Sequence, residues 1–162
     1  MTAKEVLCDV IEFARRVTRA YLSDFTDDDL LVRPIPEMNH VAWMLGHLIR
    51  SEHSLMTRID VSMPDLPPGF VDNYTGETSR SDDPKLFKTK DESLALLETD
   101  RSTILTALDA MTDDELDEPV PESMHRYART VAAVFRHVGT HELMHAGHIA
   151  AVRRKLGKPV LI

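Results

Sequence analysis

The segment from Arg129 to Leu156 constrains the fold of this chain more than any other. Its apolar residues recur at the period of an α-helix, about 100° per residue, and form one stripe of Val131, Val134, Val138, Ile149, Val152 and Leu156. His141 and His145 fall inside this stripe, where valine or leucine is expected. Residues four apart project from the same face one turn apart, so the two imidazoles can converge on one point. The segment predicts a long helix that carries a metal site inside a helical bundle.

Three further segments show the same period, so the sequence predicts an all-α protein with four helices. The expected helices run from Thr2 to Leu22, from an N-cap at Asn39 to about Asp60, from Asp91 to Met111 and from Arg129 to Leu156. The first is recognised from Val6, Val10, Phe13 and Val17. Thr2 and Glu5 have the spacing of a capping box, and Gly157 with Pro159 is typical of a helix end. No run alternates apolar and polar residues for long enough to build a sheet.

Polar, proline-broken segments connect these helices. Residues 23–38 are expected to contain a short turn from Asp27 to Leu31, and residues 112–128 form a second polar connection. Residues 61–90 contain several prolines and glycines and keep no period. A connection of this length can cross from one end of a bundle to the other, which leaves the second and third helices parallel. We expect residues 1–162 to form a single domain.

The charge and composition of the chain argue against several classes of protein. The formal net charge is -8, so the field of the protein repels phosphate backbones, and we expect no nucleic-acid partner. No run of about 18 apolar residues occurs, so we expect no membrane span. Charged residues interrupt the apolar pattern near the N-terminus, which is not typical of a signal peptide. Cys8 is the single cysteine and has no intrachain partner, which agrees with the cytoplasm, where we expect the protein to reside.

The chain has eight histidines, and by position alone His141 and His145 are the best pair for a metal site. Burying His141 beside His145 is costly unless every ring nitrogen is paired, either with a shared metal ion or with neighbouring helices. We favour the metal ion. On the second helix, His40 and His47 share a face, and spacing does not decide which of them would complete the site. His53 points away from that face and is expected at the surface.

The remaining polar candidates lie beside this predicted site or away from it. His137 and His148 lie at the edge of the stripe, and we interpret His148 as a partly exposed residue, with a supporting role beside the metal as the alternative. His125 is expected in a loop. Glu52 falls on the apolar face of the second helix, where a lone buried charge is costly. It would accept a hydrogen bond from a ligand imidazole or pair with an arginine, such as Arg16 or Arg50.

Two stretches of the sequence resemble a known family. Residues 43–48 read WMLGHL, with Glu52 after them, and residues 141–149 read HELMHAGHI, with RRKLGKP at 153–159. Together they resemble the DinB/YfiT-like superfamily, and the order of elements agrees over the whole chain. The resemblance implies a four-helix bundle of up-down-down-up topology with a long crossover between helices 2 and 3.

The resemblance also implies a divalent metal ion held by His47, His141 and His145. The chain departs from the family pattern at His148, where glutamine is common, and at Met144, where a further histidine is frequent. These departures leave the three ligands in place. They weaken any substrate preference carried over from the family.

Three neutral imidazoles would leave a divalent ion, expected to be zinc or nickel, with an open coordination position, as in catalytic sites. The resemblance implies a thiol-dependent S-transferase or related enzyme, in which the metal activates a low-molecular-weight thiol toward a small-molecule substrate. A metal-dependent hydrolase is the first alternative. A non-catalytic bundle that binds metal or ligand is the second. Family habit and apolar residues on the outer faces predict a homodimer, and the connections 61–90 and 112–128 are expected to contact the substrate.

Overall fold

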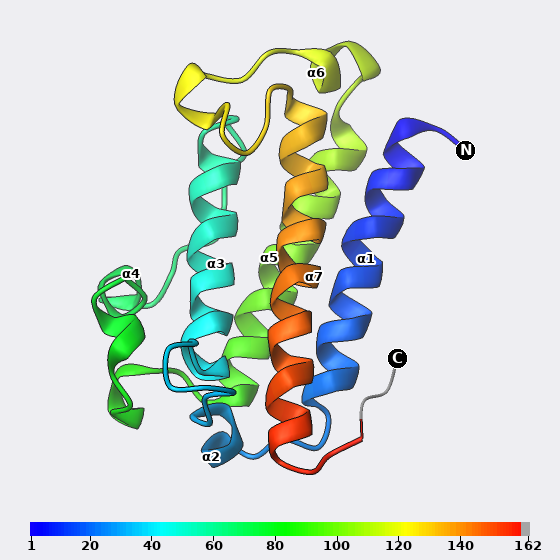
Figure 1. The fold of residues 1–162 in the computed structure, drawn as a ribbon. Helices are drawn as coiled ribbons and strands as arrows, with labels where there is room; N and C mark the ends of the chain where they lie inside the picture. The colour runs from blue at the N-terminus through cyan, green and yellow to red at the C-terminus, as the bar shows by residue number, and fades with distance from the viewer. Residues whose placement is uncertain (160–162) are drawn as a thin grey trace.

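A computed structural model describes residues 1–159 and shows four long helices packed as a bundle (Figure 1). The long helices are α1 (Ala3–Leu22), α3 (Val41–Thr57), α5 (Lys90–Ala110) and α7 (Val131–Lys155). Short helices lie in the connections: α2 (Asp27–Leu30), α4 (Phe70–Asn73) and α6 (Asp113–Asp117), with 3₁₀ turns at Thr78–Arg80, Pro84–Leu86 and Glu122–Met124. The described residues contain no strand, which confirms the all-α prediction. None of their helices is both long enough and apolar enough to cross a bilayer.

The direction of the helices follows from the long connection between α3 and α5. In Figure 1, α1 and α7 run downward, whereas α3 and α5 both run upward. Residues 58–89 return along the outside of the bundle, through α4, from the top of α3 to the foot of α5. The up-down-down-up topology and the parallel second and third helices are therefore as predicted.

Side chains at the helix starts explain most of the boundaries. The Thr2 hydroxyl accepts a hydrogen bond from the Glu5 N–H, and the Glu5 carboxylate accepts one from the Thr2 N–H, so the predicted capping box is present. At the start of α3 the prediction is wrong by one residue. His40, not Asn39, is the cap, because its Nδ1 accepts from the Trp43 N–H at 3.1 Å. Gly157 ends α7 with the left-handed φ of 70° that glycine favours, as expected.

The apolar core is divided into two halves along the bundle axis. One half surrounds the first turns of α3 and includes Tyr21, Leu45, Leu48, Leu97 and Ile149. The other lies nearer the top of the bundle and includes Ile11, Met56, Ile104, Leu108 and Phe135. Four fully buried ionisable residues, one from each long helix, lie at the level between these halves: Arg15, Glu52, Arg101 and Glu142. We call these four residues the charged layer.

The charged layer explains why α1 buries a different face from the one its apolar residues suggest. Val6 is 45% exposed and Phe13 is 42% exposed. The buried face is made of Leu7, Ile11, Ala14, Arg15, Val17, Thr18, Tyr21 and Leu22, so Val17 is buried as its spacing suggests. This rotation turns Arg15 inward toward Glu142. It also brings α1 close to α7, because a Cβ on Gly139 would lie only 2.8 Å from Cγ1 of Val10.

Candidate metal centre

Three imidazoles converge between α3 and α7. The ligand nitrogens of His47, His141 and His145 all lie within 4.8 Å of one another. The Nε2 atoms of His141 and His145 are 3.1 Å apart. Two nitrogens bound to one tetrahedral zinc ion at 2.0–2.1 Å are separated by roughly 3.3 Å, so this pair already has nearly the spacing that a shared ion requires. We call these three residues the histidine cluster.

Local packing holds each imidazole of the cluster in place. His141 and His145 lie one turn apart on α7 and present their rings edge to face, with centroids 4.8 Å apart. On α3, the ring of His47 stacks on Trp43, with centroids 4.8 Å apart and planes inclined by 10°. The Trp43 indole is itself held by its Nε1–H, which donates to the carbonyl of Thr75 at 3.0 Å. The long connection therefore helps to orient His47.

The environment keeps these imidazoles neutral. Burial lowers the pKa of His47, and the nearby Arg50 lowers it further. Burial lowers the pKa of His141 to about 4, with contributions from His47 and His137. Burial also lowers the pKa of His145 to about 3, with contributions from His141, His47 and His148. Neutral imidazoles present the free electron pairs that metal binding requires.

Hydrogen bonds from neighbouring helices do not satisfy the two α7 imidazoles. Within the described residues, the only hydrogen bond of His145 is the one shared with His141, and its Nδ1 is buried without a partner. The alternative in which each ring is paired with another helix is therefore not the arrangement found. A donor set of three neutral nitrogens that face one another fits a divalent cation.

His40 and His53 lie outside the cluster. The Nδ1 of His40 caps α3, and its Nε2 lies 3.0 Å from the carbonyl of Ser81, so both ring nitrogens are satisfied. His53, expected at the surface, is half-buried, and its Nε2 lies 2.9 Å from Oδ1 of Asp100 on α5. The geometry therefore brings His47, and not His40, beside the α7 pair, because the register of α3 against α7 sets which turn faces it.

The histidines at the edge of the predicted site extend the cluster along α7. His137 stacks on His141, with centroids 5.3 Å apart, and its other neighbour is Tyr127. His148 lies edge-on to His145 at 5.5 Å and is half-buried. His125 lies in the connection before α7, and its Nε2 is 3.1 Å from the carbonyl of Val120. His137 and His148 therefore flank the cluster at its two ends.

Glu52 has a different partner from those expected. Arg101 donates from Nη2 to Glu52 at 3.1 Å and to Glu142 at 2.6 Å, and no hydrogen bond joins Glu52 to an imidazole in the described part of the chain. Nε of Arg15 lies 3.1 Å from the second oxygen of Glu142. Sequence reasoning missed three members of this layer. Two of them have a signal in the sequence: Arg15 stands among the residues that α1 buries, and Glu142 stands beside His141.

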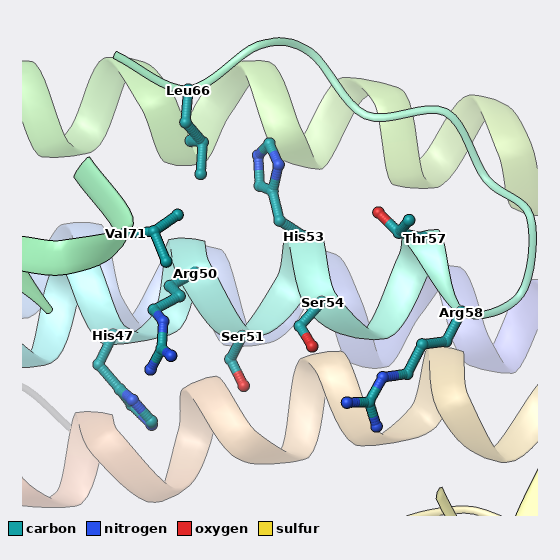
Figure 2. Close-up of a pocket in the computed structure, with 9 residues that line it drawn as sticks. All are labelled: His47, Arg50, Ser51, His53, Ser54, Thr57, Arg58, Leu66 and Val71. Carbon is teal, nitrogen blue, oxygen red and sulfur yellow. The ribbon is translucent and has the colours of Figure 1, made fainter. Parts of the chain in front are cut away.

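The histidine cluster opens onto two adjoining cavities. One, of about 690 Å³, lies between α3, α7 and the connection 118–130, and His47 and His141 line it. The other, of about 560 Å³, runs along α3 toward α4 and the connection 58–69. Figure 2 shows the second cavity, with His47 at one end and Arg58 at the other. His47 borders both cavities, so a small molecule in either one would have access to the cluster.

Comparison with known proteins agrees with this architecture. A conserved protein from Enterococcus faecalis has a similar structure, with a TM-score of 0.70, 14% identity, and coverage of 98% of this chain and 99% of that chain. YfiT from Bacillus subtilis has a TM-score of 0.71 and 19% identity over 96% of this chain and 89% of its own. YfiT is described as a probable metal-dependent hydrolase with an unusual four-helix bundle topology. At these identities the two likenesses establish the fold.

The family is established from the sequence. No curated protein matches the chain in sequence. The model of the DinB superfamily, however, matches residues 11–149, which include all three histidines of the cluster and the whole charged layer. This protein belongs to the DinB superfamily.

Proposed function

We propose that this protein is a metal-dependent enzyme in which His47, His141 and His145 bind one divalent cation. The observation that carries the proposal is the convergence of three ring nitrogens within 4.8 Å at the border of two cavities. Zinc and nickel both suit three imidazoles. The description of YfiT as a probable metal-dependent hydrolase supports a metal-dependent activity of some kind.

We further propose thiol S-transfer as the reaction class. A divalent cation at the cluster would supply a Lewis acid that ionises a thiol outright and lowers the pKa of water less completely. No aspartate or glutamate lines either cavity, and Glu52 and Glu142 are paired with arginines. A thiol ionised by the cation needs no general base, whereas water bound to the cation is only partly ionised near neutral pH and is helped by a carboxylate base. The lining residues therefore favour a small thiol as nucleophile.

Hydrolysis is the second candidate, and the description of YfiT and one observation of this structure favour it. His137 lines the larger cavity and stacks on His141, so an imidazole outside the proposed donor set lies within reach of a bound substrate. Such a group can serve as a general base. An ester or amide substrate would then take the place of the thiol and its electrophile.

A metal-binding experiment tests the shared part of both candidates. Trp43 is the only tryptophan and stacks on His47, so nickel bound at the cluster is expected to quench its fluorescence. In His141→Ala we expect the metal content after purification and the saturable quenching to be lost. His125→Ala is the matched control, because His125 bonds to the carbonyl of Val120 and lines neither cavity, and it should behave as the wild type. Equal quenching in both variants would contradict the proposed site.

An activity screen then separates the reaction classes. The metal-loaded protein is offered electrophiles together with glutathione, bacillithiol or mycothiol, and in parallel a set of esters. Thiol-dependent product formation that disappears in His141→Ala supports S-transfer, whereas thiol-independent ester cleavage supports hydrolysis. Metal binding without either activity would favour a passive binding protein.

We also retain the homodimer as a proposal. Val6 and Phe13 lie exposed on the outer face of α1, and such side chains are common in interfaces between copies of a chain. Sedimentation of the wild type and of Phe13→Ser at equal concentration tests it. We expect the variant to dissociate more readily.

A further inference from the structure

The larger cavity beside the histidine cluster has a charge opposite to that of the whole protein. Arg58 and Arg126 line this cavity, and Arg50 lines the adjoining one. No aspartate or glutamate lines either cavity, although the chain has 27 acidic and 19 basic residues. A cavity lined by arginines in an acidic protein attracts anions and repels cations.

These three arginines, like Arg80, Arg129, Arg136 and Arg154, have no carboxylate partner among the ion pairs of the described residues. Arg15, Arg33, Arg101 and Arg153, in contrast, each lie within 4.0 Å of a carboxylate oxygen. Arg50 is half-buried and donates to the carbonyl of Tyr74. Arg58 and Arg126 are exposed at the mouth of the cavity, so their guanidinium groups are available to a ligand.

We propose that Arg58 and Arg126 bind the anionic group, a carboxylate or a phosphate, of a small molecule whose reactive end reaches the histidine cluster. The inference deepens the proposed function, because it names a chemical class for the thiol or its partner substrate. Guanidinium groups bind carboxylates and phosphates through paired, charge-assisted hydrogen bonds. The cavity thus distinguishes an anionic molecule from a neutral molecule of the same shape.

The arrangement along α3 sets the length of that molecule. In Figure 2 the side chains of His47, Ser51, Ser54 and Arg58 all point to the side on which α7 lies. A helix rises about 1.5 Å per residue, so the backbones of His47 and Arg58 are about 16 Å apart. The Arg58 side chain in Figure 2 extends back along α3 toward Ser54, which shortens this span. The ligand is therefore expected to place several bonds between its reactive group and its anion, alongside the hydroxyls of Ser51 and Ser54.

Matched thiols test the inference on the nickel-loaded protein. The absorption band of a thiolate bound to nickel reports the affinity of mercaptohexanoate and of the neutral mercaptohexanol. We expect the acid to bind about tenfold more tightly than the alcohol at low salt, and the preference to shrink as salt is added. The shorter mercaptopropionate does not span the distance, so its preference over mercaptopropanol should be smaller.

Variants assign the preference to the two arginines. In Arg58→Gln and Arg126→Gln we expect the preference for the acid to fall severalfold, and in the double variant to disappear. Arg129→Gln is the matched control, because Arg129 is exposed near the same connection but lines neither cavity, and it should keep the preference. Mercaptohexanol should bind all variants equally, which shows that the cluster is intact.

The outcomes separate the two proposals. If the acid and the alcohol bind the wild type equally, or if the double variant keeps the preference, the anion site is wrong and the metal site stands. If the wild type binds no metal, the proposed function is wrong, and the anion site is judged without metal. In that case the NMR signals of the arginine Nε–H groups are followed as mercaptohexanoate is added. Shifts of the Arg58 and Arg126 signals support the inference, and the absence of these shifts overturns it.

Discussion

The histidine cluster and the charged layer are both polar interruptions of the bundle interior, and both have members on α3 and α7. His141 and Glu142 are even adjacent in sequence. The charged layer balances two guanidinium groups with two carboxylates inside the protein. The histidine cluster instead opposes three bases to one another at the wall of a cavity. The layer therefore pairs its charges within the protein, whereas the cluster would be completed by the divalent cation proposed above.

The largest effect is expected when the balance of the charged layer is broken. Glu142→Ala leaves Arg15 without an ion pair and Arg101 with Glu52 alone. Removing one partner of a buried charge network leaves an uncompensated charge, so we expect the free energy of unfolding to fall by about 3–5 kcal/mol. Urea denaturation of the metal-free wild type and variant measures this difference in the free energy of unfolding.

An exposed ion pair provides the control for this prediction. Glu98 accepts from Arg19 at 3.0 Å, with both side chains largely exposed. Solvent screens such a pair, so Glu98→Ala should cost less than about 1 kcal/mol. Similar losses in Glu98→Ala and Glu142→Ala would show that burial of the layer adds nothing.

The opposite result is expected for the histidine cluster. In the metal-free protein, His145→Leu removes a buried imidazole whose Nδ1 lacks a partner, so stability should stay the same or rise by about 1 kcal/mol. Metal at about 100 times its dissociation constant should stabilise the wild type by about 2.7 kcal/mol and leave the variant unchanged. Denaturation with a chelator and with zinc measures both. A metal-free His145→Leu protein as unstable as Glu142→Ala would mean that the cluster is structural.

Much of the fold could be predicted from the sequence, because helical period and helix-ending residues are local signals. The third helix, expected at Asp91–Met111, is found at Lys90–Ala110, and the topology follows from the length of the second connection. The buried face of α1 could not be predicted in this way. Its orientation depends on Arg15 meeting Glu142, a contact between opposite ends of the chain.

The same distinction holds for the candidate site: features local to one helix could be predicted, and features that depend on packing between helices could not. His141 and His145 could be identified from their spacing on one helix. Spacing left His40 and His47 equivalent, and the choice depends on how far α3 is shifted along α7, which only the resemblance suggested. Arg58 and Arg126 could not be assigned to a common cavity, because the path of the connection 118–130 over the helix ends sets their proximity.

A third prediction concerns the wall that the long connection forms beside the cluster. A Cβ on Gly46 would lie 2.0 Å from the ring of Tyr74, and the hydroxyl of Tyr74 accepts from the Lys88 N–H. Gly46→Ala must therefore displace the connection from α3, and we expect a loss of about 1–3 kcal/mol with weaker nickel quenching of Trp43. Gly147→Ala is the control, because nothing lies near its Cβ, and it should stabilise α7 by about 0.5–1 kcal/mol. Equal effects of Gly46→Ala and Gly147→Ala would show that the long connection does not help to form the site.

The smallest effect is a pH dependence that belongs to the charged layer alone. Burial raises the pKa of Glu52 from 4.5 to about 7; Arg101 and Arg15 lower it, and Glu142 and Asp100 raise it. A carboxyl whose pKa is higher in the folded state stabilises the fold fully below its unfolded value, and this stabilisation is lost as pH rises through the folded value. Between about pH 6 and 7 the loss from Glu52 should be about 1 kcal/mol.

Glu52→Gln isolates this contribution, because glutamine does not titrate and can still accept from Arg101. Urea denaturation from pH 5 to 8 should give a free energy of unfolding for the variant that falls less, or rises more, with pH than that of the wild type. The histidines titrate in the unfolded state of both proteins, so their contribution cancels in the difference between them. Parallel curves would mean that Arg101 and Arg15 keep Glu52 ionised from pH 5 to 8. The charged layer would then take up no proton, just as it binds no ligand.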